Sequence, residues 1–258
     1  MNWSYHPGMV MCIDVGNSTI KVARVTDGTV GMVARTATSA DPDTAADALP
    51  IGDPLTVAAA AIALVSVVPA WTEAIRDIAM GLGWILLEAD ATSIPIPVRV
   101  AHPDRVGSDR LLGAWTAREL FGAPCIVVDV GTATTIDVVA GDGAFVGGAI
   151  MPGPELAIRS LAKDTALLPP VTARLPERVI GRDTVEAIQS GVVLGHLAAI
   201  QGLLALMIDE LGAGVRPTVV LTGGGSVALG SIEGVDVVES DLLLQGLGML
   251  AQLVVVTR

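Results

Sequence analysis

The sequence is short of aromatic residues, cysteines and histidines, and each shortage excludes a class of protein or site. Only 3% of the 258 residues are aromatic while 52% are hydrophobic, so the core must be aliphatic. The two cysteines, Cys12 and Cys125, each open a run of Val and Ile residues. This predicts two buried thiols in a reducing cytosol and no disulfide framework. Three widely separated histidines and the lack of a Cys-x-x-Cys pair give no signal for a zinc site.

Basic residues are also scarce, which argues against broad nucleic-acid binding. The chain has 15 Lys and Arg against 27 Asp and Glu, and its formal net charge of −12 repels phosphate backbones. No basic region followed by an apolar stretch opens the sequence. The most membrane-like stretch, Thr56–Ala70, is shorter than the roughly 20 apolar residues of a membrane span. We therefore expect a cytoplasmic protein with no membrane segment and no nucleic-acid partner.

What the sequence does contain is an internal repeat. Residues 14–28 (DVGNSTIKVARVTDG) and residues 129–143 (DVGTATTIDVVAGDG) align without a gap at an offset of 115, with six identities in fifteen positions. In each copy an apolar run predicts a buried strand, Asp-x-Gly predicts a tight turn, and a β-branched segment predicts the second strand of a hairpin. An Asp-Gly turn then leads to a third strand, over residues 29–35 and 144–150.

Helices are predicted after each three-stranded meander. Apolar periodicity predicts helices at Pro42–Leu49, Trp71–Leu82, Gly107–Leu120, Thr184–Leu211 and Leu242–Leu253, and strands at Ala61–Val67 and Thr218–Leu221. The Pro-rich stretch Ala89–Pro103 is expected to be extended and irregular. Mixed strands and helices repeated twice predict an α/β protein of two similar domains facing a central cleft. We place these domains at residues 1–113 and 114–258.

The first repeat has residues suited to holding phosphate. Its donors are the backbone N–H groups from Gly16 onward and the side chains of Asn17, Ser18, Thr19 and Lys21. Such donors can stabilise the charge of a transferring phosphoryl group. Asp14 suits a Mg²⁺ ion held through water, since hard cations prefer carboxylates. An ordinary hairpin turn with an Asx cap is the alternative interpretation.

The second repeat offers similar chemistry. Thr134 and Thr135 are candidate donors, whereas Asp137 fits a structural position in the hairpin at least as well as a functional one. Gly147-Gly148 and Pro152-Gly153 let the backbone approach a neighbour closely. That neighbour is a ligand in one interpretation and packed protein in the other.

Gly107-Ser108-Asp109-Arg110 follows the Pro-rich stretch at a predicted helix N-terminus. Helix N-termini attract anions, and Arg110 can bind a carboxylate bidentately. From these residues alone, a capping carboxylate and a surface cation are the simpler interpretation. Thr184, with Glu186 two residues later, predicts the N-cap of another helix.

The motifs and their order resemble a known family. They are DVGNSTIK (14–21), SVVP (66–69), HPDRVGSDR (102–110), DVGTATTIDVV (129–139), GGAIMPG (147–153), TVEAIQSG (184–191) and LTGGG (221–225). Together they resemble the acetate-kinase, sugar-kinase and actin superfamily, and within it the type III pantothenate kinases, which include the Bvg accessory factor proteins. The resemblance covers about Met11 to Leu250. It implies two duplicated ribonuclease H-like domains, the actin-like ATPase fold.

The resemblance also implies a reaction and a set of site residues. The reaction is the ATP-dependent phosphorylation of pantothenate to 4'-phosphopantothenate, the first step of coenzyme A biosynthesis, with Mg²⁺ bound to ATP. Asp109 is implied as the general base, Thr132 as a nucleotide contact and Asp129 as part of a site for a monovalent cation, K⁺ or NH₄⁺. The implied pantothenate contacts are Gly107, Ser108, Asp109, Arg110 and Thr184, the last one from the partner subunit of a homodimer.

Val100 is where the chain departs from the family pattern. Relatives often carry a tyrosine at this position, which lines the pantothenate site. Its replacement removes a pocket hydrogen bond worth about 0.5–1.5 kcal/mol. Two alternatives therefore stay open at this point: a regulatory or scaffold protein that kept the fold, and a kinase of another small hydroxylated substrate.

Overall fold

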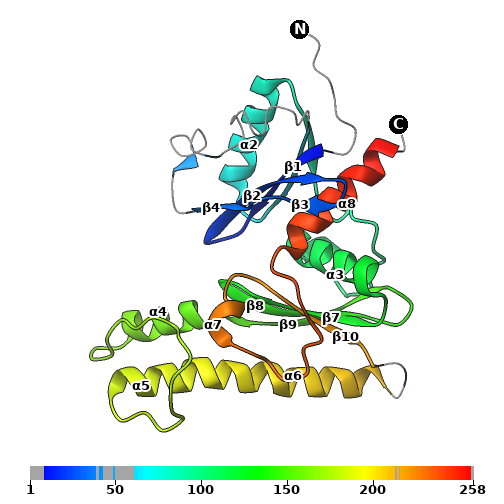
Figure 1. The fold of residues 1–258 in the computed structure, drawn as a ribbon. Coiled ribbons are helices and arrows are strands. Elements are labelled where there is room, and N and C mark those ends of the chain that lie inside the picture. Colours follow the sequence, from blue (N-terminus) through cyan, green and yellow to red (C-terminus); the bar gives the residue numbers. More distant parts are fainter. Residues whose placement is uncertain are drawn as a thin grey trace. The chain divides into compact units, whose positions relative to one another are not determined.

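The computed structural model describes residues 9–38, 41–42, 49, 61–212, 214 and 216–256, and the chain falls into two units. The first unit comprises Met1–Ile96, Ala101–Thr116 and Asp241–Arg258, and the second comprises Pro97–Val100 and Ala117–Ser240. Each unit is built on one β-sheet with helices packed against it (Figure 1). The domain boundary expected at residue 113 stays a prediction.

The sheet of the first unit mixes antiparallel and parallel strands. Its strands are β1 (Met9–Val15), β2 (Thr19–Thr26), β3 (Thr29–Val30), β4 (Ala34–Ala37), β5 (Ala61–Ser66) and β6 (Ile85–Glu88). β2 pairs antiparallel with β1, β3 and β4, whereas β1, β5 and β6 pair in parallel. Val15 is opposite Ser66, so the loops that follow β1 and β5 leave the same edge of the sheet.

Helices cover both faces of this sheet. From α2 (Pro69–Leu82), the side chains of Trp71, Ile75 and Ala79 pack into a core with β1, β2 and β5. The C-terminal helix α8 (Leu242–Val256) also packs against β1, β2 and β5. Gly248 of α8 lies against Val25, whose side chain alternates with the α2-facing residues of β2 and so points to the other face.

The second unit repeats the meander and adds parallel strands. Its strands are β7 (Cys125–Val130), β8 (Ala133–Val139), β9 (Phe145–Pro152), β10 (Thr218–Thr222) and β11 (Val237–Val238), in the sheet order β11-β10-β7-β8-β9. β10 runs parallel to β7, and Thr222 is opposite Asp129. The loops after these two strands therefore leave the same edge of the sheet.

One face of this sheet is covered by helices of the second unit (Figure 1). They are α4 (Pro154–Asp164), α5 (Thr184–Gln189), the π-helical turn η3 (Ser190–Leu194) and α6 (Gly195–Leu211). Among the described residues, the run Thr184–Leu211 is the one helix long and apolar enough to cross a membrane, with a mean hydropathy of 2.0. Such a helix is weak evidence of a span, because the core helix of a soluble protein passes the same test. Ile200 and Leu204 of α6 are indeed buried in the core of this unit.

Three further helices complete the described chain. They are η2 (Pro103–Arg105), α3 (Ser108–Phe121) and α7 (Ser226–Leu229). The Pro-rich stretch before η2 is irregular, as predicted, with a turn over residues 91–94, and Pro97–Val100 runs alongside the edge strand β9. Phe145 donates its N–H to the Pro97 carbonyl at 2.8 Å, and Arg99 donates to the Phe145 carbonyl at 2.9 Å.

The predicted elements are confirmed with three exceptions. The single strand predicted over residues 29–35 is wrong, since β3 ends at Val30 and β4 begins at Ala34. The helix predicted over Thr184–Leu211 contains the π-helical turn η3, and the helix predicted at Pro42–Leu49 falls mostly outside the described residues. Both thiols are buried as predicted. Burial raises the pKa of Cys125 to about 12 and raises the pKa of Cys12 as well, so both stay protonated.

The gapless alignment of the two repeats is wrong by one residue after the turn. In the first hairpin the last strand pair is Val15 with Ile20, and Gly16 donates its N–H to the Thr19 carbonyl at 3.0 Å. In the second hairpin the last pair is Val130 with Thr134. The turn between them is one residue shorter, so Thr135, and not Ile136, is the structural counterpart of Lys21.

Candidate active site

The first Asp-x-Gly turn follows β1 and exposes its donors. Asn17, Ser18 and Thr19 are exposed at the tip of the β1–β2 hairpin, while Asp14 at its base is 7% exposed. Asp14 is directly opposite Lys21 on β2, and Lys21 Nζ lies 3.6 Å from Asp14 Oδ2. Lys21 therefore neutralises a nearly buried carboxylate here, and its role toward phosphate stays a prediction.

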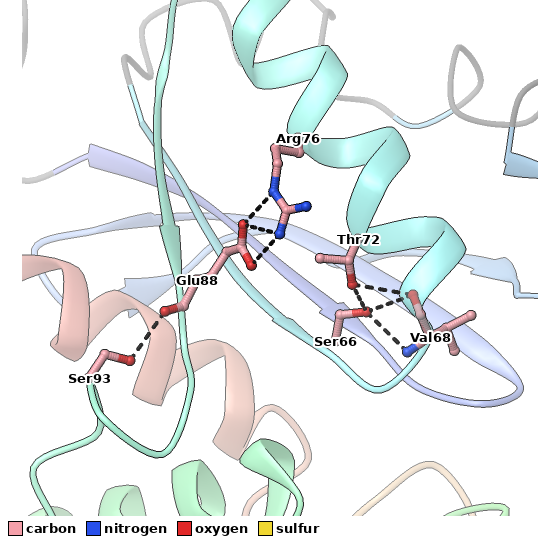
Figure 2. Close-up of polar contacts among 6 residues, drawn as sticks. All are labelled: Ser66, Val68, Thr72, Arg76, Glu88 and Ser93. Atoms are coloured by element: carbon pink, nitrogen blue, oxygen red, sulfur yellow. Dashed lines mark hydrogen bonds and ion pairs between the residues drawn. The ribbon is translucent and has the colours of Figure 1, made fainter.

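The loop after β5 runs beside this turn. Val67 donates its N–H to the Val15 carbonyl at 3.1 Å. The Ser66 hydroxyl accepts the Val68 N–H at 3.2 Å and the Thr72 hydroxyl at 2.8 Å, which fixes the start of α2 (Figure 2). The SVVP motif thus positions the turn next to it and the helix that follows it.

The same close-up shows how α2 is tied to β6. Arg76 donates from Nε and Nη2 to the two carboxylate oxygens of Glu88, both at 2.9 Å (Figure 2). The Ser93 hydroxyl donates to the Glu88 carbonyl at 3.2 Å. This bidentate pair is exposed and belongs to the scaffold of the first unit, away from the loop of Ser66.

Gly107-Ser108-Asp109-Arg110 forms the N-terminus of α3 as predicted. Ser108 is the first helical residue of this 14-residue helix, and Leu111 donates its N–H to the Gly107 carbonyl at 3.2 Å. Asp109 Oδ1 accepts the N–H of Arg110 at 2.8 Å. A Cβ at position 107 would lie 2.4 Å from that oxygen. Glycine at 107 therefore leaves the space in which the half-buried Asp109 carboxylate folds back over the helix start.

The second Asp-x-Gly turn is held by two glycine loops of the second unit. Gly225 donates its N–H to the Val130 carbonyl at 2.8 Å, and Gly153 donates to the Thr132 carbonyl at 2.9 Å. Gly223 has a φ of +91°, and a Cβ there would lie 2.3 Å from Asp129 Oδ1. At Gly153, one of the glycines whose neighbour the sequence left open, packing against this turn accounts for the glycine, because a Cβ there would lie 2.2 Å from the Gly131 carbonyl oxygen.

Asp137 and Thr135 lie on the sheet face that also carries Asp129. Thr135 is opposite Asp129, and its hydroxyl donates to Asp137 Oδ2 at 3.0 Å. Asp137 is only 2% exposed, which fits the structural interpretation. In the part of the chain that the structure describes, no three His, Cys, Asp or Glu side chains gather as a metal site.

Thr184 is the first residue of α5, and the predicted N-cap is one residue off. The Asp183 side chain accepts the N–H of Glu186 at 2.8 Å and is the cap, while Glu186 Oε2 accepts the N–H of Arg182. The Thr184 side chain contributes to a surface hollow of about 780 Å³. The hollow is lined by residues from α4, the segment before α5, α5 and η3. Neither Asp-x-Gly turn contributes to this lining.

Val100 is also placed in the second unit. The position of a Cβ on Gly147, whose φ is +116°, lies 3.8 Å from Val100 Cγ1. The ion pair between Arg99 Nη2 and Asp142 Oδ1, at 2.6 Å, fixes this segment next to β9. Val100 therefore faces a stretch of β9 where glycine leaves room beside it.

Sequence reasoning missed a buried polar pair below the second turn. The Thr134 hydroxyl and His196 Nε2 are 2.9 Å apart, and both residues are buried. Burial lowers the pKa of His196 below its ordinary value, so the neutral imidazole is favoured. The contact joins β8 to α6 across 62 positions, and no local pattern in either segment signals it.

Solved structures with a similar fold include a Baf family protein, a hexokinase and an MreB protein. A Baf family protein of Campylobacter jejuni aligns with a TM-score of 0.60 at 17% identity, covering 94% of this chain and 97% of that one. The ROK hexokinase of Thermus thermophilus gives 0.52 at 16% identity (96% and 99% covered), and MreB5 of Spiroplasma citri bound to ADP gives 0.52 at 12% identity (98% of both). The chain therefore has the actin-like ATPase and sugar kinase fold, with two duplicated α/β units as predicted.

The sequence comparisons narrow this class to one family. A family model described as type III pantothenate kinase matches residues 10–206. A type III pantothenate kinase of Thermomicrobium roseum is 36% identical over 254 residues, covering 93% of this chain and 95% of that protein. One from Akkermansia muciniphila is 39% identical over 194 residues, covering 73% and 76%.

The chain belongs to the type III pantothenate kinase family. It is a kinase that phosphorylates pantothenate in coenzyme A biosynthesis, with ATP and a divalent metal ion. The expectation drawn from the family resemblance is confirmed at this level.

Proposed function

We propose that Asp109 is the general base that accepts the proton of the pantothenate primary hydroxyl as its oxygen attacks the γ-phosphorus of ATP. The bond from that phosphorus to the bridging oxygen breaks, ADP leaves, and 4'-phosphopantothenate forms. The supporting observation is the Asp109 carboxylate at the N-terminus of α3, half-buried and oriented by the Arg110 N–H. The helix N-terminus favours the anionic base and a neighbouring anionic substrate.

The nucleotide phosphates are assigned to the two Asp-x-Gly turns. In the first unit, Gly16, Asn17, Ser18, Thr19 and Lys21 supply donors, and in the second unit Thr132 does so. The exposure of residues 17–19 supports this assignment. Mg²⁺ bound to ATP is assigned to Asp14 through water, and it would spread the charge of the transferring phosphoryl group.

A monovalent cation, K⁺ or NH₄⁺, is assigned to Asp129. This carboxylate lies at the end of β7, opposite Thr222 and packed by Gly223. Carboxylate, hydroxyl and carbonyl oxygens are the ligand types that such a hard cation takes.

Pantothenate is assigned to Val100, Gly107, Ser108 and Arg110, with Thr184 supplied by the partner of a homodimer. Apolar exposure in the second unit supports a partner: 22% of the most apolar window in Thr184–Leu211 is buried, and Leu206 is 67% exposed. Further exposed apolar residues near α5 are Leu167, Val179 and Ile180. Apolar patches of this kind mark protein interfaces. A cytoplasmic location fits the two buried, unbridged thiols.

The reaction is tested by measuring ADP release from the purified chain with ATP, Mg²⁺ and pantothenate, with and without K⁺. We expect pantothenate-dependent release that rises with K⁺ and is abolished in Asp109→Asn while ATP binding is retained. Undiminished turnover in Asp109→Asn would remove the assigned base. A folded wild type that binds ATP without turnover would favour a regulatory role, and a panel of small alcohols would detect a different substrate.

The homodimer is tested by mixing two inactive variants. Asp109→Asn and Thr184→Val would each lose activity as pure proteins. If Thr184 acts across the interface, a mixture that exchanges subunits regains activity, because one of its two sites combines both intact residues. Light scattering that reports a monomer, or a mixture that stays inactive after proven exchange, would count against the shared site.

A further inference from the structure

Thr38 holds the first phosphate turn through hydrogen bonds to two carbonyl oxygens of the turn. The Thr38 hydroxyl donates to the Gly16 carbonyl at 2.7 Å, and the Thr38 N–H donates to the Ser18 carbonyl at 3.1 Å. Thr38 follows β4 and is buried, whereas residues 17–19 of the turn are exposed. One buried residue therefore fixes two peptide groups of an exposed turn.

Fixing these carbonyls also fixes the direction of two N–H groups. A trans peptide group is planar, and its C=O and N–H point in opposite directions. The Gly16 carbonyl shares its peptide group with the Asn17 N–H, and the Ser18 carbonyl shares its peptide group with the Thr19 N–H. With both carbonyls directed at Thr38, both N–H groups point away from it. This is the orientation in which backbone donors bind phosphate oxygens.

A buried tryptophan holds Thr38 in its turn. Trp71 Nε1 donates to the Thr38 carbonyl at 3.1 Å. Trp71 is 1% exposed and packs in the core of the first unit between α2 and the sheet. The turn is thus linked through Thr38 to a rigid part of the unit, and little reorganisation is needed when a ligand binds.

The second turn has a comparable tether made by backbone alone. Gly153 donates its N–H to the Thr132 carbonyl, which by the same planarity directs the Ala133 N–H away from Gly153. In both turns, therefore, hydrogen bonds to backbone carbonyl oxygens hold the turn in place. In the first unit a side-chain hydroxyl takes part, which makes the tether accessible to mutation.

We propose that Thr38 is a positioning residue for nucleotide phosphates: it holds the Gly16–Thr19 turn so that the Asn17 and Thr19 N–H groups are oriented for phosphate before ATP arrives. The inference rests on the proposed assignment of this turn to ATP. It predicts a defect that scales with the phosphates of the ligand. A purely structural role for Thr38 predicts lower stability with an equal effect on every ligand.

The test compares Thr38→Val, Thr38→Ser and the matched control Thr36→Val. Valine keeps the shape and the backbone N–H of threonine but removes the hydroxyl, and serine restores it. Thr36 lies two residues earlier on β4, opposite Ile20 and not the turn. Binding of ATP and of adenosine to the full chain is measured by calorimetry, with melting temperatures recorded in parallel.

For Thr38→Val we expect about 10-fold weaker ATP binding, the upper range for one lost hydrogen bond, and little change for adenosine. Thr38→Ser and Thr36→Val should bind ATP like the wild type. Wild-type ATP affinity in Thr38→Val, or equal losses for ATP and adenosine, would overturn the proposal. If Thr38→Val does not fold, Trp71→Phe, which removes the indole donor together with part of the ring volume, replaces it under the same criteria.

The proposed function and the proposed role of Thr38 are contradicted by different results. A wild type that binds ATP but does not phosphorylate pantothenate contradicts the proposed function, and the ATP-to-adenosine comparison still decides the role of Thr38. A wild type that binds no ATP overturns both.

Discussion

Asp14 and Lys21 face each other on adjacent strands, with Lys21 Nζ 3.6 Å from Asp14 Oδ2. Their side chains are only 10% and 15% exposed, respectively. A charge so far removed from water is costly unless it is paired. Lys21 therefore has a structural task in addition to any contact with phosphate, and the two tasks can be separated by mutation.

Lys21→Met should destabilise the fold because it leaves Asp14 without this cation. We expect a loss of about 1–3 kcal/mol in the free energy of unfolding, as for a buried group that loses a partner. Urea unfolding of Lys21→Met, of Asp14→Asn and of the double variant Asp14→Asn/Lys21→Met gives the coupling energy of the pair. Additive losses would show that the pair contributes no coupling. Weaker ATP binding in folded Lys21→Met would support the second task of Lys21.

The buried His196 should make stability depend on pH. Burial lowers the pKa of His196 in the folded chain below its ordinary value of 6.5. The full stability associated with the neutral His196 is present above pH 6.5 and is lost as the pH falls from there through the lowered pKa. In that window the unfolded chain binds a proton that the folded chain does not. Urea unfolding between pH 7.5 and about pH 5 should therefore show a decline.

The control for this pH dependence is His196→Gln, which cannot titrate but can still form a hydrogen bond with Thr134. Its stability should change less over the same range, so the difference between wild type and variant isolates His196 from the carboxylates. Parallel curves for the two proteins would contradict the assignment of the pH dependence to this residue.

Two neighbouring glycines in the loop after β10 are expected to respond differently to replacement by alanine. Gly223→Ala introduces a Cβ at 2.3 Å from Asp129 Oδ1 and at a φ of +91°, which L-residues rarely adopt. Gly224→Ala meets nothing within 4 Å. We expect Gly223→Ala to lose more than about 1 kcal/mol of stability and most K⁺-stimulated activity, while Gly224→Ala stays near wild type in both. Equal behaviour of the two variants in kinetics and unfolding would contradict the packing described for this loop.

Helix α8 packs closely against α3 at a glycine. A Cβ on Gly246 would lie 2.0 Å from Thr116 Oγ1, so Gly246→Ala should destabilise the chain by about 1–3 kcal/mol through overpacking. Gly81→Ala in α2 meets nothing within 4 Å and should stabilise by about 0.5–1 kcal/mol, since alanine favours the helix. Thermal unfolding distinguishes the two. A neutral Gly246→Ala would mean that α8 can shift away without cost.

Much of the fold was predictable because strong local patterns carry it. The apolar runs before each Asp-x-Gly turn predicted β1 and β7, and the amphipathic pattern of Trp71–Leu82 predicted α2. The one-residue difference between the two hairpins was not predictable, since both turns start with Asp-Val-Gly and the two segments align without a gap. The predicted N-cap, Thr184, was wrong by one residue, because Asp183 is adjacent to it and Asp and Thr are both good N-caps.

The candidate site was predictable only where its residues lie in motifs. Asp109 and Arg110 do form a helix N-terminus, as their position after the Pro-rich stretch suggested. Thr38 and His196 escaped notice because their partners are 22 and 62 positions away. Contacts of that separation depend on how strands and helices pack, which single-residue patterns do not encode.

The place of α8 in the first unit also bears on how the protein is made. Synthesis proceeds from the N-terminus, yet the first unit needs Asp241–Arg258 to be complete. The second unit, Pro97–Val100 with Ala117–Ser240, has all of its residues before α8 leaves the ribosome. We therefore expect the usual N-terminal-first order of folding to be reversed. A chain truncated before Leu242 would contain the whole second unit, whereas β1, β2 and β5 would lack the helix that covers one face of their sheet, and chaperones would bind that uncovered face.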